Sequence, residues 1–587
     1  MQLSPPPDLS SNKRLVLTAL AVSAFAAAGL TWHSGNIMRS LGDPDDAMRL
    51  VLVRDLMAGR GWYDQLVLRV QPPIGVFMHW SRLLDGAIAA AIWMFELVLP
   101  PASAEAAVRF LWPMAWILPA VFGALAIARR IGGSQALFVC AIFFAANQMP
   151  FADFRPGRID HHNVQIALAV TAAASAIAGA RREFWSLISG FASGLGLAIG
   201  LEALPFHVLI GASYALGAAL GRDHIRTTRN YAIVLLGSTL VFYLAETPPW
   251  RWSLSFCDAI GLNLVAAIGV AACGLFVMTA APIQISARRR VAILAATVIA
   301  AALTYLALDT HCIHGPFGAI DTRIRPFWLD RVDEVSPIFT ILKKYFDVGV
   351  ALLLFSALTV ASAVLVLRRE APRPRTETLL ACSLVILAVP AGLAAFRMEN
   401  YVLWLGFPVL ASGAAFVSNR YWRGLMVPSA LAAVFISPVG AGLMVALITS
   451  SAAGRPHLAV SQSPVPHCWD TAAYRSLAAL PRGLVLTDVA SGPFVLANTK
   501  DSVVAAPYHR IGWGILAAHD ALSARASAAD SKVRALKVSY VVVCAAASDK
   551  PPRGSLGDDL ANGEVPGWLE TLSAKSETLQ IFRVRAR

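Results

Sequence analysis

The chain has 587 residues, of which 57% are hydrophobic and 14% charged, with a net charge of +13 and a mean hydropathy of +0.60. Soluble globular proteins carry about 25% charged residues, so this composition excludes a soluble protein, a disordered chain, a coiled coil and a collagen-like chain. Apolar stretches of about 18 to 25 residues recur along the sequence, the length that a helix needs to cross a bilayer. The composition therefore predicts a polytopic α-helical membrane protein.

The positive charge is concentrated in arginine clusters that lie between the apolar stretches. Loops on the cytoplasmic side of membrane proteins carry such an excess of Lys and Arg, so the net charge needs no nucleic-acid partner. These clusters orient the chain instead. They are Lys13-Arg14, Arg129-Arg130, Arg181-Arg182, Arg222 with Arg226 and Arg229, Arg288-Arg289-Arg290, the run Arg368 to Arg375, and Arg420 with Arg423.

Taken in chain order, the apolar stretches begin with a first span at residues 14–31 that leads outward. The stretch at 83–100 is expected to lie in the membrane interface, because a crossing there would put Arg129-Arg130 outside. Three long loops then share the outer face: 32–108, 151–162 and 309–346. The total is about 13 spans, and those after the first are predicted at 109–128, 135–150, 163–180, 184–202, 203–220, 231–246, 253–280, 291–308, 347–367, 377–396, 401–417 and 425–449.

The last part of the chain, residues 450–587, has a different character from the membrane domain, residues 1–449. Short β-branched runs broken by Gly, Pro and Asp predict strands, and an Ala-rich stretch at 513–536 predicts a helix. About 130 residues suffice for a small domain with its own core, so we expect an outer α/β domain. Its predicted strands are 483–487, 494–496, 502–504 and 540–543.

Seven cysteines are too few for a disulfide scaffold. Cys312, Cys468 and Cys544 fall in segments expected outside the membrane, where a disulfide is permitted. The sequence does not choose whether Cys468 pairs with Cys544 or with Cys312.

The first outer loop opens with three carboxylates, in Asp43-Pro44-Asp45-Asp46. An Asp cap, Pro at the first helical position and acids in the first turn are ordinary at a helix start. Arg49 is spaced to neutralise Asp45 or Asp46 from one turn on. Three acids at the mouth of a membrane domain exceed what a cap requires, so at least one of them is a candidate catalytic residue.

The second outer loop contains Asp160-His161-His162. Alternate side chains of an extended loop share a face, so Asp160 and His162 can reach one divalent cation. The alternative interpretation is a solvated loop that caps the next span at Asn163.

The third outer loop, 309–346, is longer than a connection requires, and such loops are commonly functional or disordered. It carries acidic side chains, among them Glu334, and Arg397 follows where span 377–396 meets the outer face. For Arg397, snorkelling or an ion pair is one interpretation, and binding of a lipid phosphate is the other. Acids, a histidine and an arginine on one face suit a divalent cation, Mg²⁺ or Mn²⁺, that neutralises a departing phosphate.

The order of these motifs resembles the GT-C membrane glycosyltransferases, and most of all the catalytic subunit of archaeal and bacterial oligosaccharyltransferases. Asp43-Pro44 with Arg49 resembles the Asp-Pro-x-x-x-x-Arg of its first outer loop, and Asp160-His161-His162 matches the Asp-His-His of archaeal members. The resemblance covers roughly residues 14–400. Further similar elements are Gln71-Pro72-Pro73-Ile74-Gly75 followed by Trp80, Leu118-Pro119 through Arg129-Arg130, Glu334 before Val335-Ser336-Pro337, and Arg397 as the arginine that faces the lipid pyrophosphate.

This resemblance implies particular roles for the candidate residues. The implied metal ligands are Asp43, Asp160, His162 and Glu334. The implied substrate contacts are Arg49, His161, Trp80 and Arg397. Glu334 and one of the three acids Asp43, Asp45 and Asp46 would act in catalysis. The register among these three stays open, because alignment on Arg54-Asp55 selects Asp45 and other GT-C members favour Asp46.

One motif of the family is absent. Family members read the acceptor sequon with Trp-Trp-Asp-Tyr-Gly, and Cys468-Trp469-Asp470 matches only the Trp-Asp of that motif. We therefore expect an inner-membrane enzyme of bacteria, with a periplasmic C-terminal domain. It would move a sugar or oligosaccharide from a polyprenyl-phosphate-linked donor to a lipid, polysaccharide or protein acceptor on the periplasmic face. The surrounding membrane lipids are its other expected partners. The sequence identifies neither the sugar nor the acceptor.

Two other classes of function remain. A transporter or flippase for lipid-linked saccharides would usually show inverted repeats and paired interrupted helices near the midplane, and the sequence shows neither. A non-catalytic envelope-assembly partner would tolerate loss of the acids.

Overall fold

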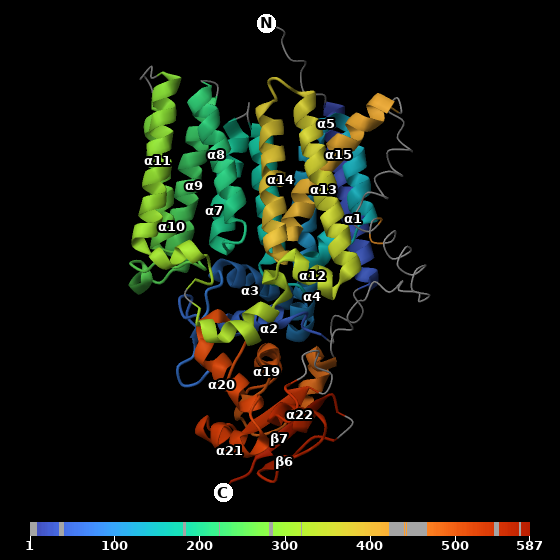
Figure 1. Cartoon of the computed structure of the whole chain (residues 1–587), viewed down its shortest axis with the longest axis vertical. Helices are drawn as coiled ribbons and strands as arrows, with labels where there is room; N and C mark the ends of the chain where they lie inside the picture. Colours follow the sequence, from blue (N-terminus) through green and yellow to red (C-terminus); the bar gives the residue numbers. More distant parts are fainter. Residues whose placement is uncertain are drawn as a thin grey trace.

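The computed structural model describes residues 9–33, 40–179, 183–221, 224–280, 286–318, 320–421, 440, 442, 467–544, 551–574 and 577–586. Long apolar helices form a bundle, and a small C-terminal domain, residues 467–586, lies at one end of it (Figure 1). We call this the domain end of the bundle. Most of the predicted span 425–449 and the predicted boundary at 450 lie outside the described residues.

The bundle confirms a multi-pass helical membrane protein. Eight helical stretches among the described residues are long and apolar enough to span a membrane, and α7 and α8 are apolar but have only 17 residues each. The total of about 13 spans stays a prediction. The long helices are α1 (Leu9–His33), α5 (Ile117–Ala146), α6 (His162–Gly179), α7 (Glu183–Ile199), α8 (Leu204–Leu220), α9 (Ile225–Glu246), α10 (Leu262–Thr279), α11 (Ala287–Leu308), α13 (Phe346–Arg369), α14 (Thr376–Ala394) and α15 (Glu399–Tyr421).

The candidate spans differ in how deeply they are buried. α6 and α15 are the most enclosed, whereas α11 lies at the edge of the bundle and buries only Arg290 and Thr297 (Figure 1). Helices in lipid satisfy their backbone polar groups internally, so an apolar helix such as α11 can face the membrane on most sides. The two enclosed helices start at the domain end, where they hold side chains of the candidate site.

α5 contains two helical segments that meet at Gly133, where φ is +78°. This left-handed backbone favours glycine, which has no Cβ. Arg129, before the break, contacts Asn12 near the start of α1, whereas Gln148, just after α5, lies against Gly29 near the end of α1. The chain therefore runs away from the domain end and returns to it, as the two predicted spans on either side of Arg129-Arg130 require.

The bundle end that lies opposite the C-terminal domain carries arginines, and we call it the arginine end. Arg130 forms an ion pair with Glu377 at 2.7 Å, and Arg375 donates to the backbone carbonyls of Arg130 and Ile131. The arginine cluster after α13 therefore packs on the turn of α5. This arrangement places these two predicted cytoplasmic clusters together.

Three shorter helices lie at the domain end, below the long ones (Figure 1). They are α2 (Pro44–Met57), α3 (Arg82–Glu96) and α4 (Pro101–Ala115). Between α2 and α3 the chain forms a hairpin of β1 (Leu66–Val67) and β2 (Val76–Phe77), in which Leu66 pairs with Phe77. α3, which contains most of the stretch expected in the membrane interface, packs on α2 and α4.

The C-terminal domain is built on a five-stranded sheet in the order β4-β3-β5-β7-β6. Its central strand is buried along its whole length, and all five of its residues are apolar enough to pack on both faces. The strands are β3 (Leu484–Leu486), β4 (Ser502–Val503), β5 (Tyr540–Cys544), β6 (Leu569–Thr571) and β7 (Leu579–Val584), and the covering helices are α19 (Gly492–Asn498), α20 (Gly512–Leu522), α21 (Ala526–Ala535) and α22 (Leu556–Ala561). The α/β class predicted from the sequence is confirmed.

Details of this domain differ from the prediction. The expected strand at 494–496 is part of helix α19, because Gly492-Pro493 begins a helix and Pro is favoured in a first turn. The expected single helix at 513–536 is two helices, α20 and α21, and strands β6 and β7 were not predicted. A short apolar run does not distinguish strand from helix by its periodicity.

Two disulfides, Cys257–Cys312 and Cys468–Cys544, join segments at the domain end. The second is one of the pairings that the sequence left open. The first was not expected, because Cys257 fell inside the predicted span 253–280. α10 begins only at Leu262, so Cys257 lies in the loop before it.

The first outer loop attaches the C-terminal domain to the bundle. Val70 forms a bridge with Val503 in β4, and the backbone N–H groups of Gln71 and Val503 donate to Val503 and Arg69 at 2.8 Å. Arg69 also donates to three carbonyls of the domain, and Arg54 of α2 donates to the carbonyl of Ala497 at 2.6 Å. The domain is therefore fixed against the segment that carries the α2 acids.

Candidate functional site

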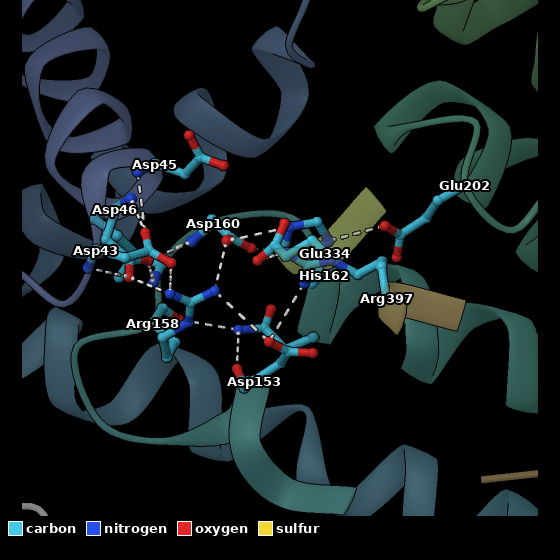
Figure 2. A network of polar contacts seen from close by, with 12 residues as sticks. Asp43, Asp45, Asp46, Asp153, Arg158, Asp160, His162, Glu202, Glu334 and Arg397 are labelled. Atoms are coloured by element: carbon cyan, nitrogen blue, oxygen red, sulfur yellow. Dashed lines mark hydrogen bonds and ion pairs between the residues drawn. The ribbon is translucent and has the colours of Figure 1, made fainter. Parts of the chain in front are cut away.

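Polar side chains from several segments that are far apart in the sequence meet at the domain end (Figure 2). They come from the first turn of α2, the loop before α6, the turn between α7 and α8, the 3₁₀ turn η7 (Asp333–Val335) and the turn between α14 and α15. The residues are Asp43, Asp45, Asp46, Asp153, Arg158, Asp160, His162, Glu202, Glu334 and Arg397.

Two of the α2 acids are engaged by the backbone. The Asp43 carboxylate accepts the N–H groups of Asp45 and Asp46 at 3.0 Å, which caps the helix. Asp46 is 1% exposed, and its Oδ1 accepts the N–H groups of Ile159 and Asp160 at 2.7 and 3.1 Å. Burial, followed by the nearby Asp160, raises the pKa of Asp46. Asp46 therefore ties the loop before α6 to the start of α2.

Asp45 differs from both. Among the described residues, none donates a hydrogen bond to its carboxylate, which is turned away from Asp43 and Asp46 (Figure 2). Burial and the carboxylates of Asp160 and Glu334 raise the pKa of Asp45 to about 7. A carboxyl group with such a pKa exchanges protons near neutral pH. The structure thus distinguishes three acids that the sequence treats alike.

Arg158, which sequence reasoning missed, lies among four carboxylates (Figure 2). Its Nη1 contacts Asp43 and, at 3.0 Å, Asp46; its Nη2 contacts Asp160 at 3.0 Å and Asp153 at 3.6 Å. A fixed positive charge therefore offsets the acids before any ligand binds. The available signal was the spacing, since Arg158 and Asp160 are alternate residues of one extended loop.

His162 is held between two carboxylates. Its Nδ1 is 2.9 Å from Glu202 Oε2. Its buried Nε2 is 3.4 Å from Asp160 Oδ2 and has no hydrogen-bond partner in the described part of the chain. Tyr401 donates to the other oxygen of Glu202 at 2.7 Å. Burial alone would raise the pKa of Glu202, and the neighbouring His162 outweighs it and lowers that pKa.

This arrangement fits a divalent cation. Metal-ligating histidines commonly donate one ring N–H to a carboxylate and bind the metal through the other nitrogen. Glu202 is that carboxylate here, and the unpartnered Nε2 of His162 faces Asp160. Ligand-capable atoms of Asp160, His161 and His162 lie within 4.8 Å of one another, as do those of Asp43, Asp46 and Asp160. Glu202, too, was missed from the sequence, in which nothing distinguishes it from other residues near a span end.

Arg397 and Glu334 meet directly. One Arg397 nitrogen forms an ion pair with Glu334, and the other is 3.5 Å from Asp153. Burial would raise the pKa of Glu334, but the adjacent guanidinium outweighs it and lowers that pKa. Asn400 fixes Asp153 from the other side, donating at 2.7 Å. The Arg397 side chain is 11% exposed and lies in the turn between α14 and α15, at the domain end of the bundle.

The remaining predicted contacts form a layer beside the acids. Arg49 is fully buried and pairs with Asp85 at 2.6 Å, not with the α2 acids, and its guanidinium lies 4.6 Å from the ring of Trp80. Trp80 packs edge-on against Tyr508 of the C-terminal domain, and its ring centre is 6.2 Å from that of His161. These side chains pack next to the acid residues of the site. Their role as substrate contacts stays a prediction.

Comparisons with solved structures show which known fold the chain shares. Archaeal oligosaccharyltransferase AglB from Archaeoglobus fulgidus, in complex with an inhibitory peptide and a dolichol-phosphate, superimposes with a TM-score of 0.64 over 96% of this chain and 74% of that one, at 15% identity. The oligosaccharyltransferase of the same organism in complex with Zn and sulfate gives 0.61 over 90% and 68%, at 16% identity. Its form tethered with an acceptor peptide containing the NVT sequon gives 0.63 over 90% and 69%, at 14% identity.

Sequence comparisons add no relative: no protein-family profile matches the chain, and no curated protein matches it. At this level of identity the structural likeness concerns the fold. The chain has the GT-C fold of the oligosaccharyltransferase catalytic subunit, as the order of its motifs predicted.

Proposed function

We propose that this chain, which has the GT-C fold, is a membrane glycosyltransferase that transfers a sugar or oligosaccharide from a polyprenyl-phosphate-linked donor. The observation that carries the proposal is the meeting of Asp45, the Asp160–His162 pair and Arg397 from separate segments at the end of a membrane bundle. The Archaeoglobus oligosaccharyltransferase has been solved with a dolichol-phosphate, which supports a lipid-linked donor here.

Arg397 is the residue that we assign to the donor phosphate. Its planar guanidinium can engage two phosphate oxygens at once. In the structure it is paired with Glu334 and near Asp153, so a phosphate would compete for a guanidinium that carboxylates already orient. The position at the start of α15 suits a donor whose lipid tail stays in the membrane while its phosphate reaches the outer surface.

A divalent cation completes the proposed site. Asp160 and His162 would hold it, and Asp43 and Glu334 are the further ligands that the resemblance implies. When bound, the cation supplies positive charge that stabilises the departing phosphate. Glu202 orients the His162 ring, and Arg158 keeps Asp43, Asp46 and Asp160 together without a metal.

Asp45 is the acid that we assign to proton transfer. Its carboxylate accepts no hydrogen bond from the described residues and has a pKa of about 7. The ionised carboxylate can therefore accept a proton from the hydroxyl of an acceptor. Asp43 and Asp46 are engaged in capping and in loop anchoring. In this assignment they position the site and Asp45 reacts.

We further propose that the domain end faces the periplasm of a bacterial inner membrane. Both disulfides of the described residues lie at that end, and disulfides persist in oxidising compartments. Arg129, Arg130 and Arg375 lie at the opposite end, which suits the cytoplasm.

The acceptor is proposed to be a lipid or a polysaccharide in preference to a protein sequon. The Trp469 ring, one of the two matching residues of the sequon-reading motif, stacks on Phe494 within the domain at 5.3 Å, and the backbone of Asp470 forms a β-bridge with that of Ser40. The stacking contact accounts for Trp469 without an acceptor peptide.

The test compares bond cleavage with transport in purified protein reconstituted into liposomes. The donors are undecaprenyl-phosphate-linked monosaccharides and undecaprenyl-pyrophosphate-linked oligosaccharides. We expect donor cleavage that requires a divalent cation and that falls roughly 10- to 100-fold or more in Asp160→Asn and Glu334→Gln, since changes around a metal site alone reach that size. The matched control is Asp330→Asn, a surface residue of the Glu334 loop. Transbilayer movement of intact donor, with no cleavage and no effect of chelation, would favour a flippase.

A further inference from the structure

A second cluster of metal-ligating side chains joins three distant parts of the chain. His79 lies in the loop before α3, Asp258 in the loop before α10, and His509 in the C-terminal domain. Each offers a ligand atom, and these atoms all lie within 4.8 Å of one another. The cluster shares no residue with the acid site, so it does not depend on the proposed function.

His79 has a free ligand atom. Its Nδ1 is buried and has no hydrogen-bond partner among the described residues. Its ring faces that of His509, with ring centres 4.7 Å apart. A buried polar atom without a partner is costly, because it has lost its contact with water and gained nothing in return. A bound ion would supply the missing partner.

Asp258 is already held in a defined orientation. Arg510 donates to both of its oxygens, at 2.7 and 2.8 Å, and His509 Nε2 lies 2.7 Å from Oδ2. A carboxylate has about four acceptor positions, so these three contacts leave one open. Insertion of a metal between His509 Nε2 and Oδ2 would keep both arginine bonds, and ligating carboxylates are commonly fixed by such outer contacts.

The types of ligand residue indicate which metal would bind. Two imidazoles and one carboxylate are ligands that zinc takes in tetrahedral sites, with a water molecule in the fourth position. Ligand atoms around tetrahedral zinc lie about 3.3 Å apart. On binding, the separation of His509 Nε2 and Asp258 Oδ2 would therefore lengthen from 2.7 Å, and the loop that carries His79 would adjust to complete the site.

The position of the cluster gives such a site a structural consequence. His79 and His509 each neighbour a residue of the Trp80–Tyr508 contact, which joins the membrane domain to the C-terminal domain. Tyr508 also donates to the carbonyl of Pro44, at the start of the helix that carries Asp45. A metal held by His79, Asp258 and His509 would fasten the domain beside the acid site.

We propose that His79, Asp258 and His509 form a zinc site that fastens the C-terminal domain to the membrane domain. The experiment uses the full-length chain in detergent, stripped with chelator and carrying Asp160→Asn with His162→Ala, so that both ligand groups of the acid site are incomplete. Zinc binding is measured by titration calorimetry, and Co²⁺ absorption reports whether the coordination is tetrahedral.

We expect one zinc ion per chain, a tetrahedral Co²⁺ spectrum, and a zinc-dependent rise in melting temperature and in resistance of the C-terminal domain to proteolysis. Affinity should fall by more than about 10- to 100-fold in His79→Ala, His79→Gln and His509→Ala, because outer-shell changes alone have effects of that size. The control His311→Ala, an exposed histidine, should keep full affinity. The melting curves of the metal-free variants show whether each is folded.

Two results would overturn the proposal. One is absence of stoichiometric zinc binding in the background that carries Asp160→Asn with His162→Ala. The other is unchanged affinity in folded His79→Gln and His509→Ala, which would reduce the cluster to an ion pair between Asp258 and Arg510.

Discussion

Arg158→Gln removes the guanidinium that contacts Asp43, Asp46 and Asp160, and the size of the effect follows from these contacts. Arg158 lies 3.0 Å from both Asp46 and Asp160, and each of these carboxylates is 1% exposed. Breaking a buried ion pair costs about 3–5 kcal/mol, because the remaining charge stays buried without compensation. Since Arg158 itself is 15% exposed, we expect the lower end of that range, about 3 kcal/mol.

The loss should also depend on pH. Burial and the neighbouring Asp160 already raise the pKa of Asp46 above 3.8, and without the arginine the repulsion among the acids raises it further. A carboxyl group whose pKa is higher in the folded than in the unfolded state contributes stability below the unfolded value and loses it as the pH rises through the folded value. The destabilisation of Arg158→Gln should therefore be small in acid and grow as the pH rises above the unfolded value of about 4.

The assay is thermal unfolding in detergent, followed by tryptophan fluorescence, with Arg155→Gln as the matched control. Arg155 is in the same loop and is exposed, so its replacement should leave the melting temperature unchanged. We expect a fall of several degrees for Arg158→Gln at neutral pH and a smaller one in acid. Melting that equals that of Arg155→Gln, or a difference that does not change with pH, would refute the reasoning about the acid cluster.

Three further predictions follow from the site and its orientation. The carboxylates of Asp160 and Glu334 help to raise the pKa of Asp45 to about 7, and a bound cation would neutralise them. The rise of the transfer rate with pH should therefore move to lower pH as divalent cation is added, and a profile that the cation does not move would exclude Asp45 as the base. Glu202→Gln should weaken divalent-cation binding roughly 10- to 100-fold, whereas the exposed Glu183→Gln should not, as measured by titration of purified protein. Tags inserted after residue 98, in the exposed turn between α3 and α4, and after residue 587 should both be accessible from the periplasm, and a cytoplasmic tag at 98 would break the predicted topology.

Much of the fold follows from composition and charge. Apolar length predicts the helices, and the arginine rule assigns Arg129 and Arg130 to a turn, which the structure forms at Gly133. The same topology assigns the segments of Asp160, Glu334 and Arg397 to one end of the bundle, where the structure brings these side chains together. Motif order was sufficient to identify the GT-C fold, even though no sequence relative matches.

The remaining features depend on contacts that sequence spacing does not encode. Asp43, Asp45 and Asp46 have the same side chain. In the structure the Asp43 carboxylate caps the helix and the Asp46 carboxylate accepts loop N–H groups, so that among the described residues only the Asp45 carboxylate accepts no hydrogen bond. Arg49 is spaced for an α2 acid, but packing of α3 against α2 brings Asp85 closer. Glu202 reaches His162 across a sequence separation of 40 residues, and such a tertiary contact leaves no local pattern.

The central claim, that this chain cleaves a lipid-linked glycosyl donor at the acid site, is tested most directly by one measurement. Release of polyprenyl phosphate or pyrophosphate from labelled donor is followed in reconstituted protein, for wild type, Asp45→Asn and Asp55→Asn. Asp55 lies on the same helix and pairs with Arg60 near the surface, so its variant controls for a lost α2 charge. We expect release by wild type and Asp55→Asn and a loss of at least about 100-fold in Asp45→Asn, the lower end of what a general base contributes. Equal release by all three would contradict the assignment of the reaction to this site, and no release by wild type with any donor class would contradict the glycosyltransferase itself.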